Sequence, residues 1–517
     1  MRQLFLSLFF ITSLIFSFSC RTRNNEFVTV ALPEKFSTLD TLTTTASDAA
    51  AERVRSLMFN ALVRKNEKFE YVGELAQEIK SSEDGKTITF ILRDGVKFHN
   101  GKAFTAADVK YTFDELFKSN GYKSGAFFDT IDDKKVPHIV SLETPDAKTV
   151  VVTLDRASLR NQLLSNFVAV PIIAEGTVAQ LSTSPVGSGP FKFVSFDQSQ
   201  NIVELAAHTD YWEGAPKVAK LRLKTVPDAN SLQAELQSGG VDIAPLPSNL
   251  SPDTINSLGK NPNLKVEQSK GSNIDYLGLN TQSAPLDNVK IRQAIGYGID
   301  REKIIKELLF GQAVIAHSIL PEESWAYNAG TKYSFDPNRA KQLLQEAGYK
   351  NEPIKFKFGA GNAAVSQYAQ VIQNALKEVG LNVEIETLES NVMRQQLALG
   401  QFQMNTGRWI GGNQDPIFLK DLFWSGAIPG EKVKCCNRSR YSNAEFDKII
   451  EEAINATNRE SAKVSYIKAQ EIVSNEVPLF PLWYPANIVV ANKRLANIKV
   501  GASGDWSFIK DITVESK

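Results

Sequence analysis

Cysteine, histidine and net charge are scarce in this 517-residue chain, and each shortage excludes a class of protein. Three cysteines are too few for the disulfide scaffold of a small secreted domain. Four histidines lie far apart and fit no zinc-ligand spacing, so no metal or other cofactor is expected. Lysine plus arginine and aspartate plus glutamate both number 58. This balance gives no net attraction to nucleic acid or to an anionic membrane surface, although a local basic patch stays open.

Long apolar runs are also missing, except at the amino end. Residues 4–16 (LFLSLFFITSLIF) are long enough for the hydrophobic part of a signal peptide and shorter than the roughly 20 residues of a spanning helix. Ser19 and Cys20 follow, and they resemble the cleavage site of a bacterial lipoprotein. We therefore expect residues 1–19 to be a signal peptide and Cys20 to carry lipid; an ordinary secretory signal is the alternative. The protein would then be a membrane-anchored lipoprotein outside the cytoplasm, periplasmic in a Gram-negative host.

The remaining chain has the composition of a soluble globular protein, with 43% hydrophobic and 22% charged residues. Its length predicts two to four domains. Strand-like segments such as 87–92 and 150–154 alternate with helical ones, and no low-complexity linker separates them. The pattern predicts a mixed α/β chain whose lobes are interleaved in sequence.

Local signals predict where several helices begin and end. Thr105 and Asp108 form a capping pattern before VKYTFDELF, and Asp287 and Asp300 can each begin a helix within 287–310. Asp336-Pro337 reads as a helix start that Gly348 ends. Residues 355–388 read as strand, helix and strand, which predicts a βαβ-like unit.

Three motifs suggest chemistry, but each has a simpler interpretation. GAGNAA at 359–364, with Glu384 and Glu386 about 20 residues later, matches a dinucleotide fingerprint, yet small residues suit any tight turn. Ser257 and Lys260 match the S-x-x-K of penicillin-recognising enzymes, but the K-T-G partner is missing. Cys435 and Cys436 are adjacent, where a disulfide is geometrically unfavourable, so reduced or loop-bridged cysteines are expected.

Several longer segments carry a family resemblance. In order, the chain resembles the family 5 extracellular solute-binding proteins of ABC importers, the group of oligopeptide- and dipeptide-binding lipoproteins. The matching segments are FSTLD at 36–40, the stretch 59–116, PVGSGPFKF at 185–193, and the segments 208–224, 287–305 and 440–450. The resemblance runs from about residue 27 to the end, and the stretch 59–116 is the most specific part.

The resemblance implies a periplasmic-binding-protein-like clamp of three mixed α/β domains with a hinge. Domains I and III would close on a ligand through strands near 268–275 and 477–485. The expected boundaries are 20–45, 176–270 and 481–517 for domain I, 46–175 for domain II, and 271–480 for domain III.

The same resemblance indicates a ligand site, with one departure. In peptide-binding members an aspartate three residues after a cleft tryptophan receives the ligand's α-ammonium. Here Gly412 stands three residues after Trp409, so that carboxylate is absent. Asp415 is the nearest acid, but Asp-Pro also reads as a helix start. The hypothesis is therefore a blocked, modified or sugar-containing peptide, or another small polar solute; the alternative is an ordinary peptide anchored by Asp415 or a distant acid.

The other candidates are less specific. Arg408 could hold a ligand carboxylate or form a surface salt bridge, and the two tryptophans flanking GGNQDP could line a cleft or belong to the core. The full set of expected ligand contacts is Phe36, Ser37, Tyr276, Asn280, Arg408, Trp409, Gly412, Asn413, Asp415 and Trp424.

The resulting prediction is a monomeric, non-catalytic, lipid-anchored protein that captures a peptide or related solute and delivers it to ABC permease subunits. It would bind no nucleic acid and would touch the membrane through its lipid. Two alternatives stay open: a receptor or chaperone for extended segments, and an acyl-transferase that uses Ser257.

Overall fold

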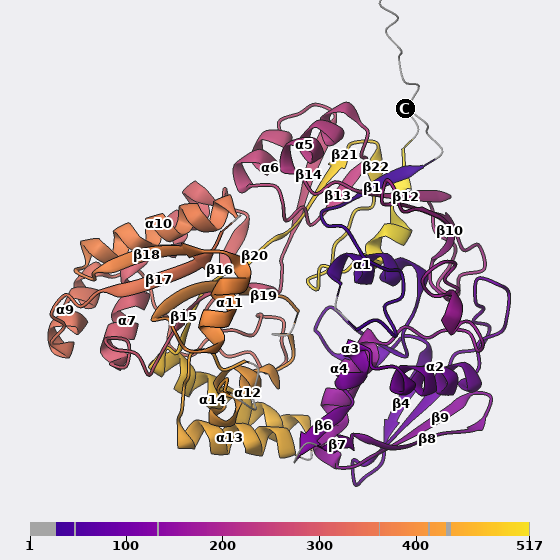
Figure 1. The fold of residues 1–517 in the computed structure, drawn as a ribbon, viewed down its shortest axis with the longest axis horizontal. Helices are drawn as coiled ribbons and strands as arrows, with labels where there is room; N and C mark the ends of the chain where they lie inside the picture. The colour runs from indigo at the N-terminus through magenta and orange to yellow at the C-terminus, as the bar shows by residue number, and fades with distance from the viewer. Residues whose placement is uncertain are drawn as a thin grey trace, which may run out of the picture.

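The computed structural model describes residues 27–45, 48–131, 134–360, 362–411, 414–430, 436–456 and 458–515. Its strands form three larger sheets, of seven, six and four strands (Figure 1). We name the parts built on the seven-, four- and six-stranded sheets lobes I, II and III. In the described residues no helix has the length and apolar character needed to span a bilayer.

The sheet of lobe I draws its strands from three separate stretches of the chain. Its central strand, β1 (Val28–Leu32), is buried along its whole length and pairs in parallel with β12 (Lys220–Thr225) and β13 (Ile243–Pro245). Helices α5 (Ala229–Ser238) and α6 (Pro252–Leu258) pack on one face through an apolar cluster. The sheet order is β10 (Phe191–Asp197), β11 (Ile202–Ala207), β12 (Lys220–Thr225), β1, β13 (Ile243–Pro245), β21 (Asn487–Asn492) and β14 (Leu264–Ser269).

Lobe II is an antiparallel sheet covered by helices. Phe167 of α4 (Arg160–Ala169) meets Phe90 of the sheet and Phe113 of α2 (Ala106–Lys118), edge to face in both cases. The helix start expected at Thr105 is confirmed, because the Asp108 carboxylate accepts the Thr105 backbone N–H at 2.9 Å. The sheet order is β4 (Ala76–Ser81), β5 (Thr87–Leu92), β9 (Thr149–Leu154) and β8 (Ile139–Asp146).

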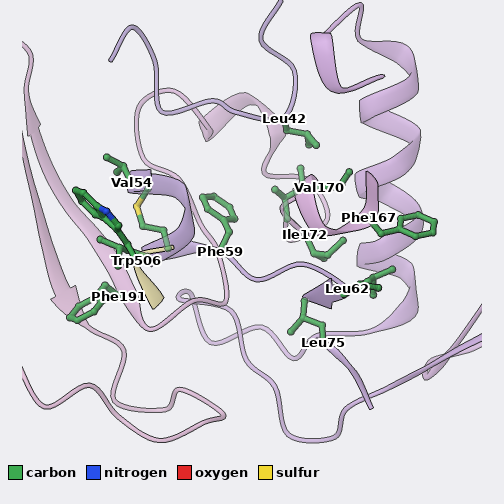
Figure 2. Packing of buried hydrophobic residues seen from close by; sticks show 14 of the residues in the cluster. Leu42, Val54, Phe59, Leu62, Leu75, Phe167, Val170, Ile172, Phe191 and Trp506 are labelled. Carbon is green, nitrogen blue, oxygen red and sulfur yellow. The ribbon is translucent and has the colours of Figure 1, made fainter. Parts of the chain in front are cut away.

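Lobes I and II share one continuous apolar core. Figure 2 shows side chains from both within it: Phe191 and Trp506 from lobe I, and Leu75 and Phe167 from lobe II. Helix α1 (Ala49–Met58) lies at this junction, with its Val54 in the same cluster. Burying so many apolar side chains together makes lobes I and II one rigid unit.

Lobe III carries helices on both faces of its sheet. On one face, the apolar cluster includes residues of α7 (Val289–Gly298), α9 (Pro337–Ala347) and α10 (Ala363–Glu378). The cluster on the other face includes residues of α12 (Phe418–Phe423), α13 (Ala444–Asn455) and α14 (Arg459–Glu476). The sheet order is β16 (Ala313–Ile315), β20 (Leu479–Pro485), β15 (Ile274–Leu279), β19 (Met404–Trp409), β17 (Ile354–Gly359) and β18 (Val383–Leu388).

Most of the local predictions for lobe III hold. Strands β17 and β18 pair in parallel around α10, which confirms the βαβ unit. Asp336 caps α9 and Gly348 ends it in a left-handed conformation, as expected. One start is wrong: α7 is capped by Asn288 rather than Asp287, because the Asn288 side chain accepts the Lys290 N–H.

Shorter elements complete the described chain. They are α3 (Tyr122–Gly125), α8 (Arg301–Lys303), α11 (Ser390–Ala398), β2 (Val63–Lys65), β3 (Tyr71–Gly73), β6 (Phe128–Ile131), β7 (Lys134–Pro137), β22 (Leu495–Ala496) and β23 (Thr513–Val514).

Two neighbouring segments connect lobe I to lobe III. Residues 270–273 lead from β14 into β15, and Ala486 lies between β20 and β21. The segments run side by side so closely that a Cβ on Gly271 would lie 2.0 Å from the Pro485 carbonyl oxygen. Because only two adjacent strands make the connection, this place has the form of a hinge.

Candidate functional site

The predicted site residues around Trp409 lie where β19 pairs with β15. Tyr276 stands opposite Gly407, and its ring stacks on Trp409 with centroids 6.2 Å apart. Trp409 also meets Phe418 edge to face at 5.0 Å. A Cβ on Gly407 would lie 2.6 Å from the Tyr276 hydroxyl, so glycine is required for this packing. Burial raises the pKa of Tyr276 to about 12.

Arg408 is paired with an acid inside the protein. Its guanidinium donates to both carboxylate oxygens of Asp275, from Nε at 2.6 Å and from Nη2 at 2.8 Å. The Trp483 indole N–H donates to the same carboxylate at 2.8 Å. Asp275 is buried, while the Arg408 side chain is 45% exposed. The Asp275 charge raises the pKa of Arg408, so the arginine stays charged, and half of its fork is already used by Asp275.

The loop after β19 is attached to the hinge. The Gly411 N–H donates to Asn273 Oδ1 at 3.2 Å, and Gln414 Nε2 donates to Ser272 Oγ at 2.8 Å. Gln414 is buried. Gly412 and Asn413, the positions predicted to face a ligand, lie outside the described residues. Gly411 and Gln414 are therefore both held next to residues 272–273 of the hinge.

Asp415 uses both carboxylate oxygens within the protein. Oδ1 accepts the Ile417 N–H at 3.0 Å, which closes a local turn and is not the helix cap that Asp-Pro predicted, because the N-cap of α12 is Ile417. The helix itself begins three residues later, with α12 at Phe418, because a turn intervenes. Oδ2 accepts a hydrogen bond from the hydroxyl of Tyr71, which lies in the β2–β3 hairpin beside β4 and α4 and so belongs to lobe II. Asp415 therefore joins two lobes, which the sequence did not indicate.

The hairpin of β2 and β3 makes further contacts with lobe III. Lys65 Nζ donates to Gln414 Oε1 at 3.1 Å, and Arg459 Nη1 donates to Glu70 Oε1 at 2.8 Å. We call these two contacts and the Tyr71–Asp415 contact the hairpin bridge. Burial lowers the pKa of Lys65, and the nearby Asp415 carboxylate opposes that effect. The bridge holds lobes II and III together at a place separate from the hinge.

Asn280 and the opening loop lie apart from this group. Asn280 is buried beyond the other end of β15, and its side chain donates to the carbonyls of Gly400 and Phe402. Phe36 is buried and stacks on Phe196 at 4.9 Å. Ser37 donates from N and Oγ to Asp48, the residue that caps α1. In these contacts the three side chains pack and bond within the protein, and ligand contact at the three residues stays a prediction.

Trp424 lies at the end of α12, in the same apolar cluster as Trp409. The Lys420 ammonium lies 4.8 Å from the centroid of the Trp424 ring. The Trp424 carbonyl accepts a hydrogen bond from Asn437 Nδ2 at 3.0 Å. The structure thus brings together Tyr276, Arg408, Trp409 and Asp415 near the hinge. The partners Asp275, Trp483, Lys65 and Tyr71 were missed. The sequence held one signal for these partners: Asp275 is the lone acid of the apolar strand IDYLGL, and a buried carboxylate requires a partner.

The remaining motifs show no shared site. Ser257 is exposed on α6, and Lys260 lies beyond the end of that helix. Cys20 and Cys435 lie outside the described residues. Cys436 is disulfide-bonded, so of the two expected states, reduced or bridged, the reduced one is wrong there. Among the described residues no cluster of three or more histidine, cysteine or acidic side chains could hold a metal.

Comparison with known proteins identifies the family. The model for bacterial extracellular solute-binding proteins, family 5, matches residues 70–430. The chain belongs to this family. It is 32% identical over 506 residues to Heme-binding protein A of Haemophilus influenzae, covering 91% of this chain and 89% of that protein. It is 28% identical over 489 residues to the Dipeptide-binding protein of Escherichia coli, covering 89% of each.

Solved structures of family 5 proteins have the same architecture. HbpA2 from Haemophilus parasuis superposes with a TM-score of 0.77 and 26% identity, covering 95% of this chain and all of that one. The ABC transporter substrate-binding protein CtaP from Listeria monocytogenes gives a TM-score of 0.82 at 22% identity, covering 95% and 99%. The fold is therefore the mixed α/β, periplasmic-binding-protein-like clamp that the sequence predicted. These relatives are binding proteins rather than enzymes.

Proposed function

We propose that this protein captures a peptide or related small solute between lobe III and lobes I and II, and delivers it to the permease of an ABC importer. The observation that carries the proposal is the hinge: a unit of two fused lobes is connected to lobe III by two adjacent strands. Ligand enclosed by closure of such a hinge shifts an existing equilibrium toward the closed form, which a permease can recognise.

The three-domain division expected from the sequence fits this function. All seven strands of the seven-stranded sheet come from the segments assigned to domain I. The four-stranded sheet falls within 46–175, and the six-stranded sheet begins at Ile274 and extends to Pro485. The hinge would then be formed by residues 270–273 and 485–487.

The ligand that the site suits best is one without free charged ends. Position 412 is glycine, Asp415 already bonds to Tyr71 and the Ile417 N–H, and Arg408 is paired with Asp275. Trp409 Nε1 is buried with no hydrogen-bond partner among the described residues, so it is a donor that a ligand carbonyl could satisfy. These features favour a blocked or modified peptide over a free one. Trp409 and Arg408 are the contacts on which the proposal relies most.

Location and partners complete the proposal. We infer that Cys20 is lipidated, that the protein is a monomer, and that the lipid keeps it next to its permease. Intact-mass measurement of protein extracted from membranes, with a Cys20→Ser variant as control, checks the lipid directly. An unlipidated, freely secreted chain would contradict the anchor without affecting the binding function.

Titration calorimetry tests the binding function. We expect N-acetylated di- to pentapeptides to bind more tightly than the same peptides with free α-amines, and Gly412→Asp to reverse this preference by about tenfold by restoring a carboxylate. Hemin belongs in the panel because one relative is named for heme. Tight binding of free peptides by the unaltered protein would eliminate the blocked-ligand hypothesis. A hydrolysed or acylated product would point to the Ser257 enzyme, and binding only to unfolded chains would point to a chaperone.

A further inference from the structure

The hairpin bridge is concentrated on one short element. Lys65 lies at the end of β2 and Tyr71 at the start of β3, and Glu70 directly precedes Tyr71. Each has a partner in lobe III, and Lys65 and Tyr71 reach adjacent residues, Gln414 and Asp415. A single hairpin therefore makes side-chain contact with the loop that also carries the position-412 glycine.

Lys65 has the surroundings of a bound cation. Its ammonium lies 3.1 Å from Gln414 Oε1 and 5.8 Å from the centroid of the Tyr71 ring. The Asp415 charge acts on it in a partly buried environment. An amide oxygen, an aromatic face and a carboxylate are the groups that receive an ammonium ion in proteins. The chain's own lysine therefore occupies the place beside Asp415 in which a ligand amine could bind.

Gln414 connects this cation to the hinge. Its Oε1 accepts from Lys65 of lobe II, and its Nε2 donates to Ser272 in the hinge segment. The amide is buried, so an unmatched donor or acceptor there is costly. Movement of lobe III away from lobe II breaks the Lys65 contact, and water must then replace the ammonium at the Gln414 oxygen. The closed arrangement is thus the one in which both ends of the amide are bonded within the protein.

We propose that Lys65 is a built-in substitute for a ligand ammonium, which closes the clamp by bonding to Gln414 next to Asp415 and thereby selects ligands that carry no free α-amine. The selectivity part rests on the proposed function, whereas the closing part does not. A free amine entering beside Asp415 meets the like charge of Lys65, so it gains nothing there. A neutral ligand end meets no such repulsion.

Small-angle scattering of the purified, exhaustively dialysed protein tests the closing part without any ligand. The variants are Lys65→Met and Tyr71→Phe, alone and combined, and the control is Lys68→Met, which removes an exposed lysine on the same hairpin. Each bridge substitution should lower the ratio of closed to open molecules by about tenfold, so the double variant has a larger radius of gyration. Circular dichroism checks that all of these variants remain folded. A double variant with the profile of the unaltered protein would overturn the proposal.

Calorimetry with one acetylated tripeptide and its free counterpart tests the selectivity part. Lys65→Met should shift the affinity ratio toward the free peptide by about tenfold, and Lys68→Met should leave the ratio unchanged. An equal ratio in both variants would overturn the selectivity. If neither peptide bound any variant, peptide capture itself and the selectivity part would both fall, and the scattering result would still decide whether Lys65 closes the clamp.

Discussion

Lobe II contacts its two neighbours in opposite ways. Toward lobe I it shares one apolar core, in which Phe167 of lobe II and Trp506 of lobe I belong to the same cluster. Toward lobe III its side-chain hydrogen bonds include the hairpin bridge, whose three contacts are polar, and the turn Ala157–Leu159 also approaches α13. Separating an apolar core exposes large areas to water, whereas polar groups that part regain water as a partner. The first junction is therefore permanent and the second reversible.

The largest effect on stability should come from the hinge, where the two connecting segments must stay in contact. Gly271→Ala places a methyl group against the Pro485 carbonyl, 2.0 Å away in the unaltered backbone. Since the neighbouring atom is backbone, we expect a loss of about 3 kcal/mol in the free energy of unfolding. Urea denaturation measures it. Gly125→Ala is the control, because a Cβ there meets nothing within 4 Å. Equal stability of the two variants would mean that the hinge strands separate freely.

A smaller effect concerns a charge at the permanent junction. Lys123 of α3 lies 2.7 Å from Glu52 of α1. Burial, and then Arg55, lower the pKa of Lys123 to about 7, from 10.5 in the unfolded chain. Between these pH values the unfolded state binds the extra proton, so Lys123 makes stability rise with pH from about 7 to about 10. Lys123→Met should remove about 1 kcal/mol or more of that rise.

Thermal unfolding at several pH values checks this charge effect. The difference between Lys123→Met and the unaltered protein should be most favourable to the variant near pH 7 and should shrink toward pH 10. A difference that does not vary with pH would show that Lys123 stays charged throughout, and the junction would then resemble the polar bridge more than an apolar core.

The smallest effect belongs to the rim of the bridge. Glu70 and Arg459 form an ion pair between side chains that are 35% and 43% exposed. Exposed pairs contribute about 0.5 kcal/mol, so a double-mutant cycle with Glu70→Gln and Arg459→Gln should give a coupling near that value that fades in high salt. A salt-independent coupling several times larger would make the rim, rather than Lys65, the main closing contact.

Local structure was predictable where a few neighbouring residues decide it. The cap at Thr105, the start at Asp336 and the βαβ unit of 355–388 each depend on contacts within one or two elements. The family resemblance likewise anticipated the clamp. The Asn288 cap differed from expectation because two adjacent residues could both cap, and only the backbone path selects one of them.

The candidate site was less predictable, because its partners are distant in sequence. Asp275 and Arg408 meet only when β15 and β19 pair in one register, across 133 positions. Lys65 and Gln414 are 349 positions apart and belong to different lobes. Composition and local pattern carry no information about such pairs. The aromatic pair Tyr276 and Trp409 was anticipated residue by residue, yet its stacking follows from the same register.

The sheet of lobe I has a consequence for the order of folding. Strand β21, close to the carboxyl end, lies between β13 and β14, so until residues 487–492 are present β14 has no partner strand and β13 has only β1. Lobes II and III obtain all their sheet strands earlier in the chain. A ribosome-bound chain can thus complete its outer parts while its central sheet still lacks a strand. Native assembly of the whole waits for the last few dozen residues to be synthesised.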